Sequence, residues 1–259
     1  MLYCLCLYKF YPNIKLYLKN MEIKYTYSPN YNIRKRQKNA IKSIVIHYTG
    51  MQSERESIKR LCSLKSKVSS HYLINRNGKV YNFVKDSNIA WHAGKSRWYK
   101  YKNLNFNSLG IELVNKGHRF GYTNFTNKQI SKLVKLCLLL IRKYKIKKRN
   151  IVGHSDIAPL RKIDPGEKFP WEYLAKNKIG IWHSYNSNFL KKFRKIKASK
   201  KDMKIFKKIL KKIGYHFLST KSDFSKTTKA FQRRFRKELI SGQLDQECLI
   251  ISQNLAKKL

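Results

Sequence analysis

The sequence has few acidic residues, few cysteines and no long apolar run, and these shortages exclude several classes of protein. Its five cysteines are odd in number and show no CxxC spacing, which argues against a disulfide framework and a thiolate zinc site. The apolar stretch at 136–141 is far shorter than the ~20 residues that cross a bilayer, so we predict no transmembrane segment. Because 42% of the 259 residues are hydrophobic and 13% aromatic, wholesale disorder is also excluded.

Acidic residues are outnumbered: 58 Lys and Arg face 14 Asp and Glu, a formal net charge of +44. Such a surplus indicates an acidic partner, such as nucleic acid, anionic lipid or an anionic cell-wall polymer. The alternative is compositional bias, because 44 of the basic residues are Lys and only 14 are Arg. Since phosphate and base recognition favours the Arg guanidinium, we favour bias in a generally acidic environment. We therefore predict no specific nucleic-acid partner.

Residues 1–24 are interpreted as an N-terminal extension to the folded body. The first 20 residues, MLYCLCLYKFYPNIKLYLKN, lack a basic n-region, and their apolar stretch before Lys9 is short for an export signal. Met21 is an alternative start residue. An export signal is therefore not evident, and we leave this segment out of the fold prediction.

The next part of the chain, 25–183, alternates strand and helix patterns, which predicts an α/β domain. Residues 43–48 (SIVIHY) and 109–114 (LGIELV) are apolar and rich in β-branched or long aliphatic side chains, typical of buried strands. An Asn-Gly pair at 77–78 predicts a hairpin. Further strands are expected at 70–74, 79–84 and 151–154, and helices at 53–65, 126–144 and from Pro170. The expected fold is a central mixed β-sheet flanked by helices.

The composition then changes twice. Residues 184–201 are rich in Asn, Ser and Lys and are interpreted as a basic linker. Residues 202–259 carry three helical patterns, at 203–213, 228–237 and 244–259, which predict a small three-helix domain. The sequence leaves the oligomeric state open.

Two histidines and one aspartate are candidate metal ligands. His47 and His154 come at the ends of predicted strands, where sites form at the rim of a sheet, and Asp164 follows in a loop. Two imidazoles and a carboxylate are a typical ligand set of catalytic zinc. The alternative, that each histidine is satisfied separately by backbone hydrogen bonds, is the more probable one for any single histidine. Taken together, the three residues favour one Zn2+ site.

Two more charged residues are candidate catalytic groups. Glu112 lies inside an otherwise apolar strand, where a carboxylate is costly unless paired or functional. It could pair with a lysine, or act as a general base toward the attacking water. Lys162 lies two residues before Asp164, so both side chains project to one face of an extended segment. Its ammonium would then stabilise an oxyanion at the metal, although one Lys among 44 is weak evidence by itself.

Six segments resemble the zinc-dependent N-acetylmuramoyl-L-alanine amidases of the type 2 amidase family, and most closely its AmiD-like members. They occur in the family's order: SIVIHYTG (43–50), VSSHYLINRNGKVYNFV (68–84), IAWHAGKSRW (89–98), SLGIELVNKG (108–117), IVGHSDIAP (151–159) and RKIDPGEKFPW (161–171). The tail, with KIFKKILKKIGY and KAFQRRFR, is similar to the peptidoglycan-binding domain of such amidases.

The resemblance implies a role for each candidate. His47, His154 and Asp164 would bind zinc, Glu112 would be the catalytic acid/base and Lys162 would stabilise the transition state. The implied reaction is hydrolysis of the amide between the lactyl group of N-acetylmuramic acid, or its anhydro form, and L-alanine of the stem peptide. The alternative function is non-catalytic peptidoglycan recognition. Further residues in family motifs are expected to shape the groove or to pack: His71, His92, Trp91, Trp98 and Asn115.

The expected partner is peptidoglycan or a muropeptide, and this bears on location. A wall-binding tail has little use in the cytosol, so we expect a periplasmic, envelope or secreted protein. A cytoplasmic location is the alternative, because no export signal is evident.

Overall fold

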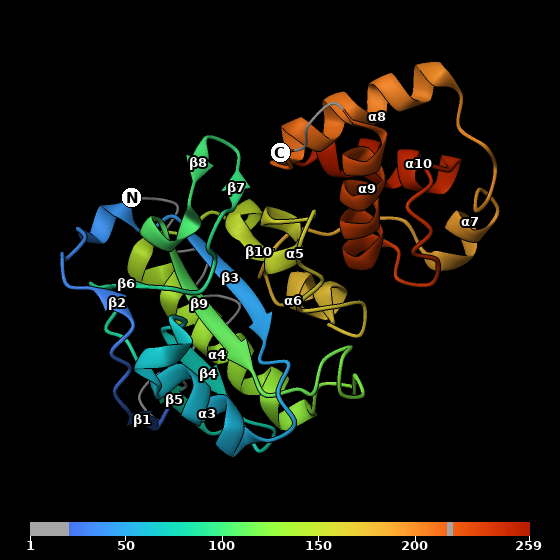
Figure 1. Ribbon diagram of the computed structural model, residues 1–259. Coiled ribbons are helices and arrows are strands. Elements are labelled where there is room, and N and C mark those ends of the chain that lie inside the picture. The colour runs from blue at the N-terminus through green and yellow to red at the C-terminus, as the bar shows by residue number, and fades with distance from the viewer. Residues whose placement is uncertain (1–20, 217–219) are drawn as a thin grey trace, which may run out of the picture.

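The computed structural model describes residues 21–216 and 220–259, so the expectations for residues 1–20 lie outside the described residues. A six-stranded mixed sheet forms the centre of the first part of the chain (Figure 1). Only β4 and β5 pair antiparallel, and the other neighbours are parallel. Its strands, in spatial order, are β1 (Ile23–Tyr25), β5 (Val80–Asn82), β4 (Tyr72–Ile74), β9 (Ser108–Leu113), β3 (Ser43–Tyr48) and β10 (Ile151–Gly153).

Short elements complete the edges of this domain. Two small two-stranded sheets pair β2 (Tyr31–Asn32) with β6 (Ile89–Ala90) and β7 (Arg97–Trp98) with β8 (Tyr101–Lys102). Single turns of 3-10 helix lie at Lys38–Ala40, Leu64–Ser66, Leu104–Phe106 and Lys148–Asn150.

One face of the sheet is covered by the long helix α4 (Asn127–Tyr144), which lies behind the sheet in Figure 1. Thr126 begins this helix as predicted, because its side chain accepts a hydrogen bond from the Gln129 amide. Alternate side chains of β3 and β9 point to this face and form one apolar core with the helix: Ile44, Ile46, Leu109, Ile111, Leu113, Leu133, Leu136, Cys137 and Leu140. Cys137 is thus a core residue, as expected.

The opposite face of the sheet carries two apolar clusters with a polar strip between them. The first cluster lies under α3 (Glu54–Cys62), which is capped by Ser53 as predicted, and includes Leu61 and Leu73. The second includes Val45 and Val152 and continues into the C-terminal helices. Between these clusters, the alternation of side chains along β3 and β9 puts polar residues on the same face.

Four helices form the C-terminal part of the chain: α7 (Ser187–Lys191), α8 (Lys200–Ile213), α9 (Lys221–Phe235) and α10 (Gln246–Lys257). The segment expected to be a linker thus contains α7, and Leu190 of this helix is buried in the second cluster. Helix α9 begins seven residues before the predicted start because Thr220 caps it ahead of its apolar side chains. In the part of the chain that the structure describes, no helix is both long and apolar enough to cross a membrane.

A buried charged cluster joins the helical unit to the α/β domain. Asp156 lies in the short helix α5 (His154–Ile157), and its Oδ2 accepts a hydrogen bond from Arg234 Nη1 of α9 at 2.6 Å. Its Oδ1 accepts another from the Tyr215 hydroxyl at 2.6 Å. The Arg234 guanidinium also stacks on Trp171, the first residue of α6 (Trp171–Lys176), with its Cζ 4.1 Å from the ring centroid. The two units therefore share one buried interface.

Loss of the Arg234 charge should destabilise the fold far more than loss of an exposed cation. In the Arg234–Asp156 pair the side chains are 2% and 1% exposed, so Arg234→Gln leaves a buried carboxylate without its counter-charge. We expect the free energy of unfolding to fall by about 3–5 kcal/mol, measured by urea denaturation. The matched control is Lys176→Gln, whose pair with Glu172 is 72% and 53% exposed, and it should cost less than about 0.5 kcal/mol. Equal losses in the two variants would contradict the interpretation.

Candidate metal centre and active site

The site lies where three neighbouring strands end. His47 is the fifth residue of β3, and Glu112 of β9 is its partner in the parallel register. His154 comes directly after β10 and is the first residue of α5, so the predicted end of the strand was wrong by one residue. Asp164 lies in the loop after α5, where its carbonyl oxygen accepts a hydrogen bond from the Ser155 amide at 2.8 Å. That bond fixes the loop against the start of α5.

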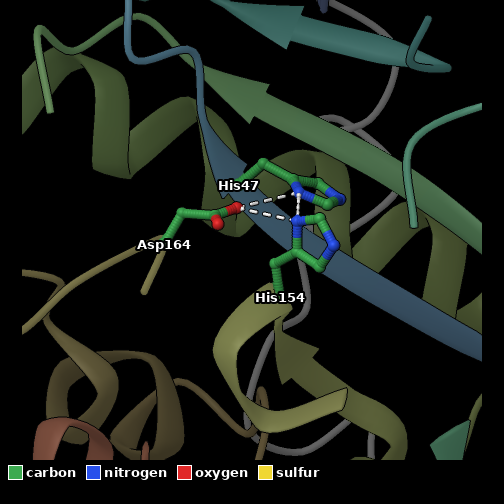
Figure 2. Close-up of side chains that lie close together, drawn as sticks. All are labelled: His47, His154 and Asp164. Carbon is green, nitrogen blue, oxygen red and sulfur yellow. Dashed lines mark hydrogen bonds and ion pairs between the residues drawn. The ribbon is translucent and has the colours of Figure 1, made fainter. Parts of the chain in front are cut away.

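The three predicted ligands converge on one point (Figure 2). His47 Nδ1 lies 3.0 Å from His154 Nδ1 and 3.0 Å from Asp164 Oδ2, and His154 Nδ1 lies 3.1 Å from the same oxygen. Tetrahedral zinc with bonds of about 2.0–2.2 Å requires ligand atoms about 3.3 Å apart. All three residues are buried, and the described residues contain no other such metal-binding cluster. The donor set and its spacing therefore fit a single metal ion of the zinc type.

One short segment orients both imidazoles. His47 Nε2 lies 3.1 Å from His92 Nδ1, and His154 Nε2 lies 3.2 Å from the Ala93 carbonyl oxygen. The Ala93 carbonyl can only accept, and this favours a proton on His154 Nε2 with the Nδ1 lone pair facing the site. The same tautomer of His47 is obtained when Nε2 donates to His92. Two consecutive residues thus direct both Nδ1 atoms toward the metal position.

His92 is itself held in a tight position above the sheet. A Cβ atom on Gly110 of β9 would lie 2.5 Å from His92 Cγ, so only glycine leaves room for the ring there. His92 Nε2 lies 3.3 Å from the Ser108 hydroxyl, and Ser108 donates to the Leu104 carbonyl oxygen. His92 was expected to shape the groove or the sheet, but its contact with Gly110 was not predicted. The IAWHAG motif marked the segment, but its partners are distant in sequence.

The electrostatics favour the metal-binding protonation states. Burial, and then the neighbouring imidazole of His154, lowers the pKa of His47 to about 4, so this ring is neutral at pH 7. Burial alone would raise the pKa of Asp164, but the imidazoles of His154 and His47 hold it well below its usual range. A neutral imidazole and an ionised carboxylate are the forms that bind a metal ion.

Glu112 is an unpaired carboxyl group beside this cluster. Its Oε2 is buried and has no hydrogen-bond partner among the described residues, which excludes a simple structural salt bridge for this oxygen. Burial, and then the charge of Asp164, raises the pKa of Glu112 to about 8. The positive charges of Lys162 and Arg60 act in the opposite direction. An unsatisfied carboxyl group with a raised pKa next to a metal cluster is typical of a catalytic acid/base.

Lys162 lies partly exposed at the same site. Its charge lowers the pKa of both Glu112 and His47, which places its ammonium within electrostatic reach of both groups. The preceding Arg161 anchors this segment through hydrogen bonds to the carbonyl oxygens of Ala93 and Lys95. The loop that carries Lys162 and Asp164 is therefore tied to the segment that orients the histidines.

The remaining expected groove residues divide into packing and loop roles. Trp98 is 1% exposed and belongs to the second apolar cluster, so it packs and does not line the site. Asn115 is buried and its side chain ties down the loop after β9, through the Gly117 amide and the Thr123 carbonyl oxygen. Trp91 is partly exposed and donates to Asn32. His71 accepts a hydrogen bond from the Gly110 amide and supports the sheet.

Sequence reasoning did not find an aromatic wall that adjoins the site. Tyr48 follows His47 directly, and its hydroxyl lies 3.0 Å from His118 Nδ1. The His118 ring stacks on Tyr122 with centroids 4.4 Å apart, and its Nε2 lies 3.1 Å from Glu167 Oε2. Burial, and then the charge of Asp164, raises the pKa of Tyr48 to about 12. These rings therefore form an ordered boundary on one side of the metal cluster.

Comparison with known proteins identifies the family. A family model described as N-acetylmuramoyl-L-alanine amidase (Amidase_2) matches residues 37–167, about half of the chain, including the three converging ligands, Glu112 and Lys162. The chain belongs to this amidase family. It is 36% identical over 234 residues to the N-acetylmuramoyl-L-alanine amidase AmiD of Escherichia coli K12, which covers 84% of this chain and 83% of AmiD. This span is too long for the α/β domain alone, so the likeness extends into the helical unit.

Solved amidase structures agree with this assignment. The E. coli AmiD structure, a complex with the substrate anhydro-N-acetylmuramic acid-L-Ala-D-gamma-Glu-L-Lys, superposes with a TM-score of 0.75 at 33% identity, covering 87% of this chain and 93% of AmiD. AmpDh3 of Pseudomonas aeruginosa gives a TM-score of 0.74 at 30% identity, with 89% and 96% coverage. The amidase family and the mixed sheet flanked by helices are therefore confirmed. The alternative of a non-catalytic recognition protein is not supported.

Replacing Glu112 should stabilise the metal-free amidase. In the folded state the pKa of Glu112 is about 8, whereas an unfolded glutamate titrates near its usual value of about 4.3. The folded state therefore keeps a proton that the unfolded state releases, and this group makes the fold less stable as pH rises between those two values. Glu112→Gln should raise the free energy of unfolding by several kcal/mol at pH 8, at about 1.4 kcal/mol per pKa unit, and by little at pH 4.5.

Urea denaturation at the two pH values measures this difference. The control is Glu22→Gln, which changes an exposed glutamate and should alter the free energy of unfolding by less than about 0.5 kcal/mol. A stability change that is equal at both pH values for Glu112→Gln would contradict the raised pKa.

Proposed function

We propose that this chain is a zinc-dependent N-acetylmuramoyl-L-alanine amidase. In this proposal it hydrolyses the amide between the lactyl group of N-acetylmuramic acid, or its anhydro form, and L-alanine of a peptidoglycan stem peptide. One observation carries the proposal: His47, His154 and Asp164 offer three ligand atoms to one point, beside the unpaired carboxyl group of Glu112. The substrate class follows from AmiD of E. coli, which was solved with an anhydromuramyl tripeptide.

Zn2+ is the ion that this donor set favours. Two imidazole nitrogens and one carboxylate oxygen are a typical ligand set of catalytic zinc, and these three residues would hold the ion. When bound, zinc would supply Lewis-acid chemistry, by lowering the pKa of water and polarising the scissile carbonyl. His92 and the Ala93 carbonyl would keep the ligand nitrogens unprotonated.

The protein's own groups would then move the proton and stabilise charge. Glu112 would accept a proton from the attacking water and return it to the nitrogen of L-alanine as the amide bond breaks. Burial raises the pKa of Glu112 toward neutral pH, which suits a group that must both take up and release a proton. The Lys162 ammonium would stabilise the negative charge that develops on the lactyl carbonyl oxygen. The products would be a lactyl carboxylate on the glycan and a free stem peptide.

A cell-envelope location, periplasmic or secreted, is part of the proposal. Its support is the substrate, because intact peptidoglycan is found outside the cytoplasmic membrane. The proposal also assigns the helical unit at 202–259 to peptidoglycan binding, with the α/β domain at 25–183 as the catalytic part.

Activity should depend on the metal ion and on its aspartate ligand. Peptide release from soluble anhydromuramyl tripeptide, followed by chromatography, should stop after chelation and return on addition of Zn2+. Asp164→Ala should bind zinc at least about 10-fold more weakly in a competition titration with a chromogenic chelator. Asp202→Ala, which alters an exposed cap of α8, is the control and should bind zinc normally. Cleavage that continues in excess chelator would refute the zinc mechanism.

Glu112 and Lys162 should affect turnover and not substrate binding. Glu112→Gln should lower kcat by about 10²–10⁴-fold, because no group replaces it in proton transfer. Lys162→Met should lower kcat by about 10²–10³-fold, the size of effect that one oxyanion-stabilising group has. Lys162→Arg should restore part of the loss because it keeps the charge. A rise in KM with unchanged kcat in either variant would contradict the assigned roles.

A further inference from the structure

A basic cleft of about 860 Å³ lies between the α/β domain and the helical unit. One wall is the β7–β8 hairpin, another is the connection from α4 to β10, and the third is the C-terminal end of α8. It is lined by Lys42, Arg97, Tyr99, Lys100, Tyr101, Lys145, Lys147, Arg149, Asn150, Lys211, Gly214, Tyr215 and His216. None of these residues belongs to the metal site.

The charge of this cleft exceeds what the composition alone would give. Seven of its 13 lining residues are Lys or Arg, whereas 58 of the 259 residues in the chain are. The described residues that line it include no Asp or Glu. A concave surface with cations from three separate segments concentrates positive potential, so an anionic ligand is expected.

The aromatic walls of the cleft are rigid. Trp98 is buried, and its ring packs edge-on against Tyr215 with centroids 5.1 Å apart. A Cβ on Gly214 would lie 2.6 Å from the Trp98 ring, and the Gly214 carbonyl accepts a hydrogen bond from the Tyr99 amide at 3.0 Å. The Arg149 guanidinium lies over the Tyr99 ring, 5.1 Å from its centroid. These contacts pack the hairpin against the end of α8 on the aromatic side of the cleft.

Two polar atoms in the cleft walls are unsatisfied. Arg97 Nε and the Tyr99 hydroxyl are buried and have no hydrogen-bond partner among the described residues. Both residues line the cleft, but these two atoms are shielded from solvent, so a ligand would reach them only after the side chains move.

The cleft lies at the other end of the sheet from the catalytic site. Lys42 immediately precedes β3, and His47 is five residues further along the same strand. At about 3.3 Å per residue, their Cα atoms are roughly 16 Å apart. A ligand in the cleft would therefore lie at the opposite end of the sheet from the metal site, and we assign it to a second strand of the wall.

We propose that this cleft binds the carboxylate-bearing stem peptide of a second peptidoglycan strand, and so anchors the enzyme to the wall during catalysis. The inference rests on the proposed function. A stem such as L-Ala-D-gamma-Glu-L-Lys has free carboxylates on its γ-linked glutamate and at its end. The volume of the cleft is in the range of sites for small ligands and peptides, whereas a nucleic-acid duplex needs a long open surface. Engagement of two strands would raise the apparent affinity for intact wall.

The test removes two cations from the cleft and compares intact wall with soluble substrate. The variant is Arg97→Gln with Arg149→Gln, in the full-length chain. The matched control is Lys24→Gln with Lys79→Gln, because both lysines are exposed and lie about 6 Å from the Tyr81 ring at the far edge of the sheet. Binding to purified sacculi is measured by cosedimentation in a Glu112→Gln background, at about 0.15 M salt. Sacculi with amidated carboxylates are the second probe.

We expect the cleft variant to bind sacculi about 10-fold more weakly than the parent, and the control to change by less than about twofold. Amidated sacculi should bind the parent as weakly as native sacculi bind the cleft variant. With Glu112 intact, the cleft variant should keep the kcat and KM of the parent on soluble anhydromuramyl tripeptide. If the parent does not cleave that tripeptide, the proposed function fails. The binding measurements on native and amidated sacculi still test the cleft.

Three results would overturn the proposal. Equal binding of the cleft variant and the control to sacculi would exclude the cleft as an anchor. Tight binding to amidated sacculi would exclude carboxylate recognition. A selective loss of binding to single- or double-stranded DNA in the cleft variant would assign the cleft to nucleic acid instead. Should Arg97→Gln with Arg149→Gln fail to fold, the exposed pair Lys42→Gln with Lys147→Gln gives the same comparison.

Discussion

The site depends on the orientation of two imidazole rings by one dipeptide. The side chain of His92 contacts Nε2 of His47, and the carbonyl oxygen of Ala93 contacts Nε2 of His154. Either ring nitrogen of a neutral histidine can carry the proton, so a metal site needs a second contact on each ring to fix which one does. The dipeptide supplies both contacts from one rigid turn of backbone. The buried Gly110 beneath it allows this close approach.

The polar strip on the sheet, which contains His47 and Glu112, lowers the stability of the fold and supplies the groups of the site. On the α4 side, β3 and β9 contribute apolar residues to a continuous core. On the other side, the same strands place His47 and Glu112 next to each other, and the carboxyl oxygen Oε2 of Glu112 is buried without a partner. A sheet optimised for stability alone would continue its apolar packing there. Such unsatisfied groups are typical of sites that act on a ligand.

Much of the fold was predictable because its signals are local. The apolar strands, the Asn-Gly hairpin and the Thr126 cap each depend on a few consecutive residues. The candidate ligands were predicted because two histidines stand at the ends of predicted strands and an aspartate follows in a loop. The family was predicted from the order of six motifs. The orienting contacts and the basic cleft could not be predicted, because they join residues far apart in sequence, such as Lys42 and Lys211. Helix α9 was placed late because its first turn has no apolar periodicity.

The Asp156 cluster limits how this architecture can be rearranged in evolution. Helix α5 begins with His154 at the metal site, and two residues later Asp156 contacts Arg234 and Tyr215 of the helical unit. A recombination event that exchanged the C-terminal helices for an unrelated module would leave this aspartate buried without its counter-charge. The two parts are therefore expected to be inherited together, with the three interface residues as a heritable set. A successful chimera would have to transplant that set or replace Asp156 as well.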